Sequence, residues 1–214
     1  MKLYPSNLPW ILLLVSLLLD LLFQNLLPRL FFGQDLRRDL PSALLAPDSR
    51  TRPLFCGWTG IFCVASAFTG VTISESFLPV SFGWCVPLLT GYALFVTFLA
   101  VAAFSPKEGE RKRGGKLRNA QFHQDTANAA PFMLLLVTLP LGVLLLLDGR
   151  VFPGIVSLVC FAAQTFCAAA FLLGKKPRFA GGVLAQPGLW VRQAALFGYL
   201  PLCALALTVL LQPR

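Results

Sequence analysis

Residues 129–173 read AAPFMLLLVTLPLGVLLLLDGRVFPGIVSLVCFAAQTFCAAAFLL, and this stretch decides the class of fold. Two apolar segments, 129–147 and 151–173, are separated only by Asp148, Gly149 and Arg150. Each segment is long enough to cross the apolar interior of a bilayer, which takes about 20 helical residues. The stretch therefore predicts two membrane-spanning helices joined by a very short connection.

The composition of the whole chain agrees with a membrane protein. Of its 214 residues, 57% are hydrophobic and 13% are charged, and the mean hydropathy is +0.73. Soluble domains carry about 25% charged residues, and a small domain keeps much of its surface in water. Lipid must then be the solvent for much of this chain, so we expect an all-α integral membrane bundle.

Working outward from residues 129–173, four further segments have membrane length. We therefore expect a single transmembrane domain over residues 1–214, with about six spans and no sizeable soluble part. The six expected spans are 8–32, 54–77, 80–104, 129–147, 151–173 and 189–211.

The first segment could be mistaken for a signal peptide. Only Lys2 precedes it, Asp20 interrupts its apolar run, and no A-x-A-like cleavage site follows. We therefore expect a spanning helix, which Pro28 and Arg29 should end or bend.

Basic residues fall in alternate loops and set the expected orientation. The chain has 18 Lys and Arg against 9 Asp and Glu, and most of the basic residues lie in loops 33–53, 105–124 and 174–188. Short cytoplasmic loops are enriched in Lys and Arg, so these three loops should face the cytoplasm and both termini the other side. Anionic lipid head groups are the expected partners of this charge, and the sequence contains no nucleic-acid-binding motif. Plasma and internal membranes are both compatible with the sequence.

Loop 33–53 contains LRRDLPSALL at residues 36–45. Two interpretations are open. The segment is either a short interfacial helix, with arginines among the head groups and leucines below them, or a solvated loop.

Asp20 is the first candidate functional residue, in LLLDLLFQNLL at residues 17–27. A carboxylate within a span is costly and marks a functional site by default, and Gln24 lies one helical turn later on the same face. Asp20 is therefore a candidate proton, cation or substrate site. The alternative is a hydrogen-bonded Asp that holds helices together.

Glu75 is the second candidate, in TGVTISESF at residues 69–77. This stretch is the most polar part of the first three spans. It predicts either a small outward-facing vestibule or a Glu side chain that reaches the membrane interface.

The six cysteines predict packing and not a metal centre. Cys56 and Cys63 are seven residues apart, as are Cys160 and Cys167, so each pair lies on one helical face about 10 Å apart. That distance is too long for two ligands of one metal ion, and no pair has the C-x-x-C spacing. There is also no P-loop, G-x-S-x-G or H-E-x-x-H motif, so we expect no metal and no cofactor from these patterns.

The stretch RNAQFHQDTANAAPF, residues 118–132, leads from the most basic loop into the fourth span and holds the only histidine, His123. Asp125 suits the start of a helix, where a negative side chain interacts favourably with the helix dipole. Pro131 is tolerated in the first helical turn. The stretch is thus explained as a polar helix entrance.

The same stretch resembles the motif R-A-H-x-N-T-x-E-N-x-P-F of the MAPEG family, membrane-associated enzymes of eicosanoid and glutathione metabolism. His123, Thr126, Pro131 and Phe132 match the motif, while Asp125 stands at an Asn position and Asn128 at a Glu position. Arg118 is a stand-in for the leading Arg, at an imperfect offset. The resemblance covers about residues 85–211. It implies a glutathione site at the cytoplasmic interface, formed by Arg118, His123, Asp125 and Asn128, and activity on lipophilic substrates.

Three functions remain as hypotheses. The first is a non-catalytic subunit of a membrane assembly, formed with other membrane subunits or by self-association, because the spans are apolar and carry small-residue faces. The second is a small transporter or channel-like protein that uses Asp20, Gln24 and Glu75. The third is the MAPEG-like enzyme, which alone would require glutathione. The first hypothesis is favoured, so catalysis is not expected.

Overall fold

The computed structural model describes residues 7–32, 35–41, 52–104, 116–176, 178 and 182–211, with only the course of the backbone for residues 27, 31, 32 and 116–124. Regular secondary structure in these residues is entirely helical. The elements are α1 (Leu8–Leu21), the π-helical η1 (Leu22–Leu26), α2 (Leu27–Phe32), α3 (Arg52–Phe77), α4 (Phe82–Phe104), α5 (Lys116–Met133), α6 (Leu135–Leu147), α7 (Val151–Gly174), the 3-10 segment η5 (Val183–Ala185) and α8 (Pro187–Leu210).

Six helices are long and apolar enough to cross a membrane, which confirms the expected all-α bundle of six spans. They cover Leu8–Leu30, Arg52–Phe77, Phe82–Phe104, Asp125–Leu147, Val151–Gly174 and Pro187–Leu210. The largest departure from the predicted bounds is in the fourth span, which begins at Asp125 and not at residue 129. The polar stretch before it is itself helical, since α5 begins at Lys116.

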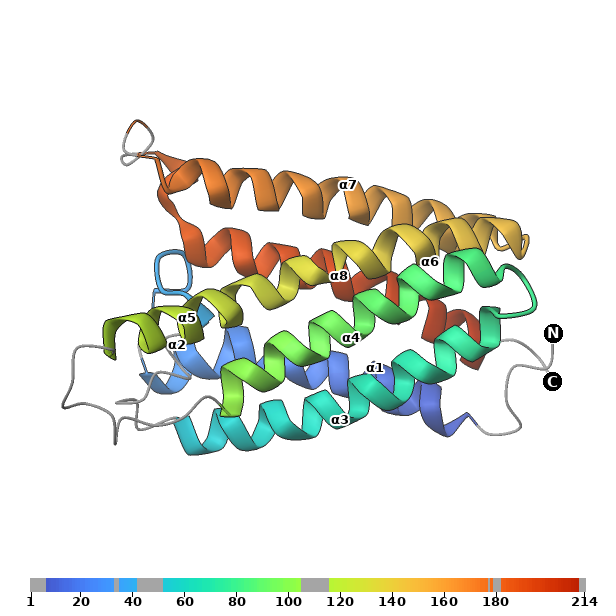
Figure 1. Cartoon of the computed structure of the whole chain (residues 1–214), viewed down its shortest axis with the longest axis horizontal. Helices are drawn as coiled ribbons and strands as arrows, with labels where there is room; N and C mark the ends of the chain where they lie inside the picture. The colour runs from blue at the N-terminus through green and yellow to red at the C-terminus, as the bar shows by residue number, and fades with distance from the viewer. Residues whose placement is uncertain are drawn as a thin grey trace.

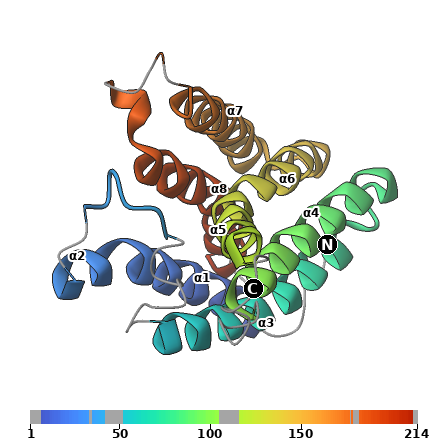
Figure 2. The same ribbon diagram turned by 60° about the vertical axis from the view of Figure 1, so that its left-hand side comes forward.

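The helices run along the long axis of the bundle, with α7 along one edge and α1 and α3 along the other (Figure 1). Helix α8 is central, because it packs against α1, α5, α6 and α7 (Figure 2). Helix α4 packs against α3, α5 and α6 and completes the bundle. We call the end of the bundle at which α3, α5 and α8 begin the basic end, because each of these helices follows one of the basic segments of the sequence.

Small residues allow the helices to approach closely within the chain. A Cβ added to Gly91 of α4 would lie 2.7 Å from the backbone carbonyl of Leu136 in α6, and one added to Gly70 would lie 2.8 Å from the ring of Tyr92. On the same α3 face, the Cys56 thiol donates to the carbonyl oxygen of Ala103 in α4 at 3.2 Å. The small-residue face of α3 is therefore used for contact with α4.

Gln164 of α7 forms hydrogen bonds with three other helices in the middle of the bundle. Its fully buried amide Nε2 donates to the carbonyl oxygens of Pro131 in α5, at 2.8 Å, and Ala194 in α8, at 3.2 Å. Thr138 of α6 donates to Gln164 Oε1 at 3.2 Å. Because lipid offers no hydrogen bonds, these contacts fix α7 against its neighbours.

The first span is distorted where Pro28 was expected to end or bend it. The π-helical segment η1 ends at Leu26, two residues before Pro28, and the helix then continues as α2 to Phe32. Proline has no N–H to donate to the carbonyl four residues earlier, which here is that of Gln24. The sequence LRRDLPSALL is described only as far as Pro41, and its described part is a turn, while residues 42–45 lie outside the described residues.

Candidate functional site

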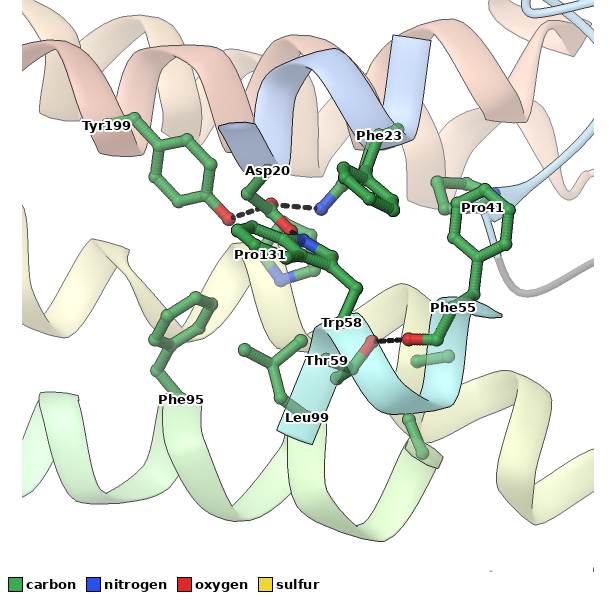
Figure 3. Close-up of a pocket in the computed structure, with 13 residues that line it drawn as sticks. Asp20, Phe23, Pro41, Phe55, Trp58, Thr59, Phe95, Leu99, Pro131 and Tyr199 are labelled. Carbon is green, nitrogen blue, oxygen red and sulfur yellow. Dashed lines mark hydrogen bonds between the residues drawn. The ribbon is translucent and has the colours of Figure 1, made fainter. Parts of the chain in front are cut away.

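Asp20 is the centre of a polar cluster that three helices form inside the bundle. Its side chain is 4% exposed. Oδ1 accepts a hydrogen bond from the indole Nε1 of Trp58 in α3 at 2.9 Å. Oδ2 accepts from the hydroxyl of Tyr199 in α8 at 2.8 Å and from the amide Nε2 of Gln24 at 2.5 Å (Figure 3). The Asp20 carboxyl thus ties α1, η1, α3 and α8 together.

The backbone explains how the three partners reach one carboxyl. Gln24 is four residues after Asp20 and lies above it on the same helical face. Asp20 is twelve residues after Leu8, about 18 Å along the helix axis, and so lies past the midpoint of the span towards the basic end. Trp58 is six residues into α3, which starts at the basic end and runs back along the bundle. Tyr199 enters from the central helix α8.

The Asp20 cluster borders a cavity of about 40 Å³. A buried water needs on the order of 10–15 Å³, so the cavity has room for a few water molecules or for a group of similar size. Among the described residues, Asp20 is the only charged one that lines it. The lining residues are Asp20, Phe23, Gln24, Pro41, Phe55, Trp58, Thr59, Phe95, Leu99, Ala102, Ala127, Pro131 and Tyr199.

The three hydrogen bonds leave Asp20 able to accept more. An ionised carboxylate has about four acceptor positions, and Trp58, Tyr199 and Gln24 occupy three of them. All three partners are neutral, and neither of the two described ion pairs includes Asp20. A proton or a positively charged group can therefore be accommodated at this carboxyl.

Like Asp20, Arg192 is an ionisable residue that is buried within a span. It lies in the last span and is 5% exposed. Its Nη1 donates to the carbonyl oxygens of Leu36 and Asp39 at 2.6 Å each, and to that of Gly188 at 3.2 Å. Its Nε donates at 3.2 Å to the carbonyl oxygen of Gln24. Pro28 cannot donate the α-helical hydrogen bond to this carbonyl, because proline has no N–H, and Arg192 donates to it instead.

Gln24 therefore links the two ionisable residues, since its side chain binds Asp20 and its carbonyl binds Arg192. Arg192 also fixes the 35–41 loop over the basic end of the bundle. The N–H of Leu189 strengthens this attachment by donating to the carbonyl oxygen of Arg37 at 3.1 Å. The loop supplies Pro41 to the cavity wall.

Glu75 lies elsewhere. It is exposed near the end of α3, and it is 17 residues beyond Trp58, about 25 Å along the helix axis. The neighbouring hydroxyls of Thr72, Ser74 and Ser76 each donate to the carbonyl four residues earlier in α3. Their hydrogen bonds are thus satisfied locally, and Glu75 does not line the Asp20 cavity.

The opening stretch of the fourth span contributes to the cavity through Ala127 and Pro131. Asn128 is buried, at 6% exposed, and its Oδ1 has no hydrogen-bond partner, whereas Asp125 is exposed. Arg118 and His123 lie on α5, and their side chains are outside the described part of the chain. The structure thus brings Asp20 and Gln24 together with one face of α5.

Sequence reasoning missed Trp58, Tyr199 and Arg192. Arg192 could have been found, because a lone Arg within a span is costly and marks a site in the same way as Asp20. Trp58 and Tyr199 carry no such signal, since aromatic residues are common in membrane helices. Their role depends on how α3 and α8 pack against α1.

We predict that Arg192→Met lowers the free energy of unfolding by about 2–4 kcal/mol, because the half-buried carbonyls of Leu36, Asp39 and Gln24 lose their donor. Thermal unfolding in mild detergent measures the change. The control is Arg38→Met, because the Arg38 side chain is 83% exposed and its removal should change stability by less than about 0.5 kcal/mol. Equal effects of the two substitutions would contradict the assigned role of Arg192.

No protein-family model, no curated protein and no solved structure matches the chain. The resemblance of residues 118–132 to the MAPEG motif therefore stays a prediction. The function of the chain has to be inferred from the Asp20 cavity and the residues that line it.

Proposed function

We propose that this polytopic membrane protein binds a small polar solute in the Asp20 cavity and belongs to the transporter class. The observation that carries the proposal is a carboxyl inside a membrane span that borders an internal cavity and has only neutral partners. Ionisable residues in this position are expensive in lipid and usually belong to solute or proton pathways.

The surrounding contacts support binding at this place. Trp58, Tyr199 and Gln24 hold the carboxyl in one orientation, so little ordering is needed when a ligand arrives. Arg192 holds the 35–41 loop beside the cavity, at the basic end. An ionised Asp20 is costly without a counter-charge, so solute binding should be linked to gain or loss of a proton at this carboxyl.

The test is proton flux in liposomes that contain the purified chain and a trapped pH indicator. Pools of anionic, neutral and cationic polar solutes are added outside in turn. We expect at least one pool to change the internal pH with the wild-type chain. Asp20→Asn should abolish this change, because Asn cannot release a proton at neutral pH and its NH2 group would face at least one of the three donors.

The matched control is Glu75→Gln, which makes the same chemical change outside the cavity and should leave the flux unchanged. If no pool produces a flux, or if the flux of Asp20→Asn equals that of the wild type, the proposal is wrong. Loss of flux in both variants would show that carboxyls in general, and not the Asp20 cavity, matter for the signal.

A non-catalytic subunit of a membrane assembly is a second proposal. The Asp20 cluster supports it, because its hydrogen bonds hold helices together without any ligand. The small-residue face of α3 gives it no support, since that face packs against α4. This proposal predicts a native mass in mild detergent above that of one chain. A lone monomer of 23.3 kDa, after correction for detergent, would count against it.

A MAPEG-like enzyme is a third proposal, and the buried Oδ1 of Asn128 favours it, because an acceptor without a partner suits a ligand that donates hydrogen bonds. Under this proposal glutathione should raise the thermal unfolding temperature, and Asn128→Leu should remove that increase. No shift at saturating millimolar glutathione would leave the proposal without support.

A further inference from the structure

The walls of the Asp20 cavity combine one carboxyl with several aromatic rings. Five of its lining residues are aromatic, and they come from η1, α3, α4 and α8: Phe23, Phe55, Trp58, Phe95 and Tyr199. The rings are packed against one another. Phe23 stacks on Trp58, with centroids 4.7 Å apart and planes 12° apart, while Phe95 and Tyr199 meet edge to face at 6.4 Å (Figure 3).

Aromatic rings and a carboxyl attract the same kind of ligand. The face of an aromatic ring carries negative electrostatic potential, and groups of such rings recognise ammonium and methylated ammonium ions. A carboxylate adds a full negative charge, whose attraction for a cation is stronger in a poorly solvated cavity than in water. No Lys or Arg is among the described lining residues to oppose a cation.

We propose that the solute bound by this cavity is a small organic ammonium cation, held by the Asp20 carboxylate and by the faces of the surrounding rings. This inference rests on the proposed function, because it names the class of solute for the same site. The fourth acceptor position of Asp20 receives an N–H of the cation or faces its methyl groups.

Size restricts the ligand further. The cavity of about 40 Å³ holds only a few water-sized groups, and the stacked rings of Phe23 and Trp58 resist enlargement because both pack against buried apolar clusters. Ammonium ions with one to four methyl substituents match this space, whereas tetrapropylammonium is too large. The cavity therefore selects by charge and by size together.

Other ligand classes fit less well. An anion would meet the carboxylate without a compensating cation in the described wall. A Mg²⁺ or Ca²⁺ ion needs about six oxygen ligands, whereas the lining offers one carboxylate, the amide of Gln24 and two hydroxyls. One of these hydroxyls, that of Thr59, already donates to the carbonyl oxygen of Phe55 at 2.7 Å.

The experiment measures the thermal unfolding temperature of the purified full chain in mild detergent with four probes of different charge or size. The probes are tetramethylammonium chloride, tert-butanol as a neutral molecule of similar size, sodium pivalate as an anion of similar size, and tetrapropylammonium chloride. Sodium chloride keeps the ionic strength constant. Only a ligand that binds the folded state raises the unfolding temperature, so we expect a rise with tetramethylammonium alone.

Two Trp variants separate the cavity from general effects of the cation. Trp58→Leu removes a ring from the wall and should weaken tetramethylammonium binding by about tenfold. Trp84→Leu removes an exposed Trp near the start of α4 and should leave binding unchanged. Equal binding by both variants would overturn the assignment to this cavity. If Trp58→Leu does not fold, the test rests on the four probes with the wild-type chain, where a rise with any probe other than tetramethylammonium would overturn the proposal.

The outcomes distinguish this inference from the proposed function. If pivalate or tert-butanol stabilises the chain, or if anionic or neutral solutes drive the Asp20-dependent proton flux, the ammonium assignment is wrong while the transporter proposal stands. If tetramethylammonium binds but no solute moves protons, the cavity is a cation site and the transporter proposal is wrong. If no probe binds and no solute moves protons, both are wrong.

Discussion

A carboxyl group within a membrane span must find its hydrogen bonds inside the protein, and this constraint organises the bundle. Asp20 meets it with donors from Trp58, Tyr199 and Gln24. Trp58 and Tyr199 lie far from Asp20 in the chain, so the carboxyl selects one arrangement of α1, α3 and α8. A different packing of these helices would leave Asp20 in lipid without partners, at a cost of several kcal/mol.

The same constraint explains the irregular parts of the structure. Pro28 removes a donor from the first span, and Arg192 supplies the missing bond at the carbonyl of Gln24. In doing so Arg192 satisfies much of its own hydrogen-bonding capacity and attaches the 35–41 loop to α8. The π-helical segment, Pro28, Asp20 and Arg192 thus form one connected region, and the cavity lies beside it.

The sequence was sufficient to predict the spans, because a run of about 20 apolar residues has few stable conformations other than a membrane helix. It also identified Asp20 and Gln24, since polar residues are conspicuous in such a run. It could not identify Trp58 and Tyr199 as their partners, because that depends on the rotation and depth of α3 and α8. For the same reason it could not separate Glu75 from Asp20: Asp20 contacts Trp58 near the start of α3, whereas Glu75 lies near the end of that helix.

The central claim is that Asp20 and its partners act as one unit within the bundle. A double-mutant cycle tests it most directly: unfolding free energies in mild detergent are measured for the wild type, Asp20→Asn, Tyr199→Phe and the double variant. Tyr199 donates directly to Asp20 at 2.8 Å, so we predict a coupling energy of about 1–2 kcal/mol. Additive effects of the two substitutions, with no coupling, would contradict the account.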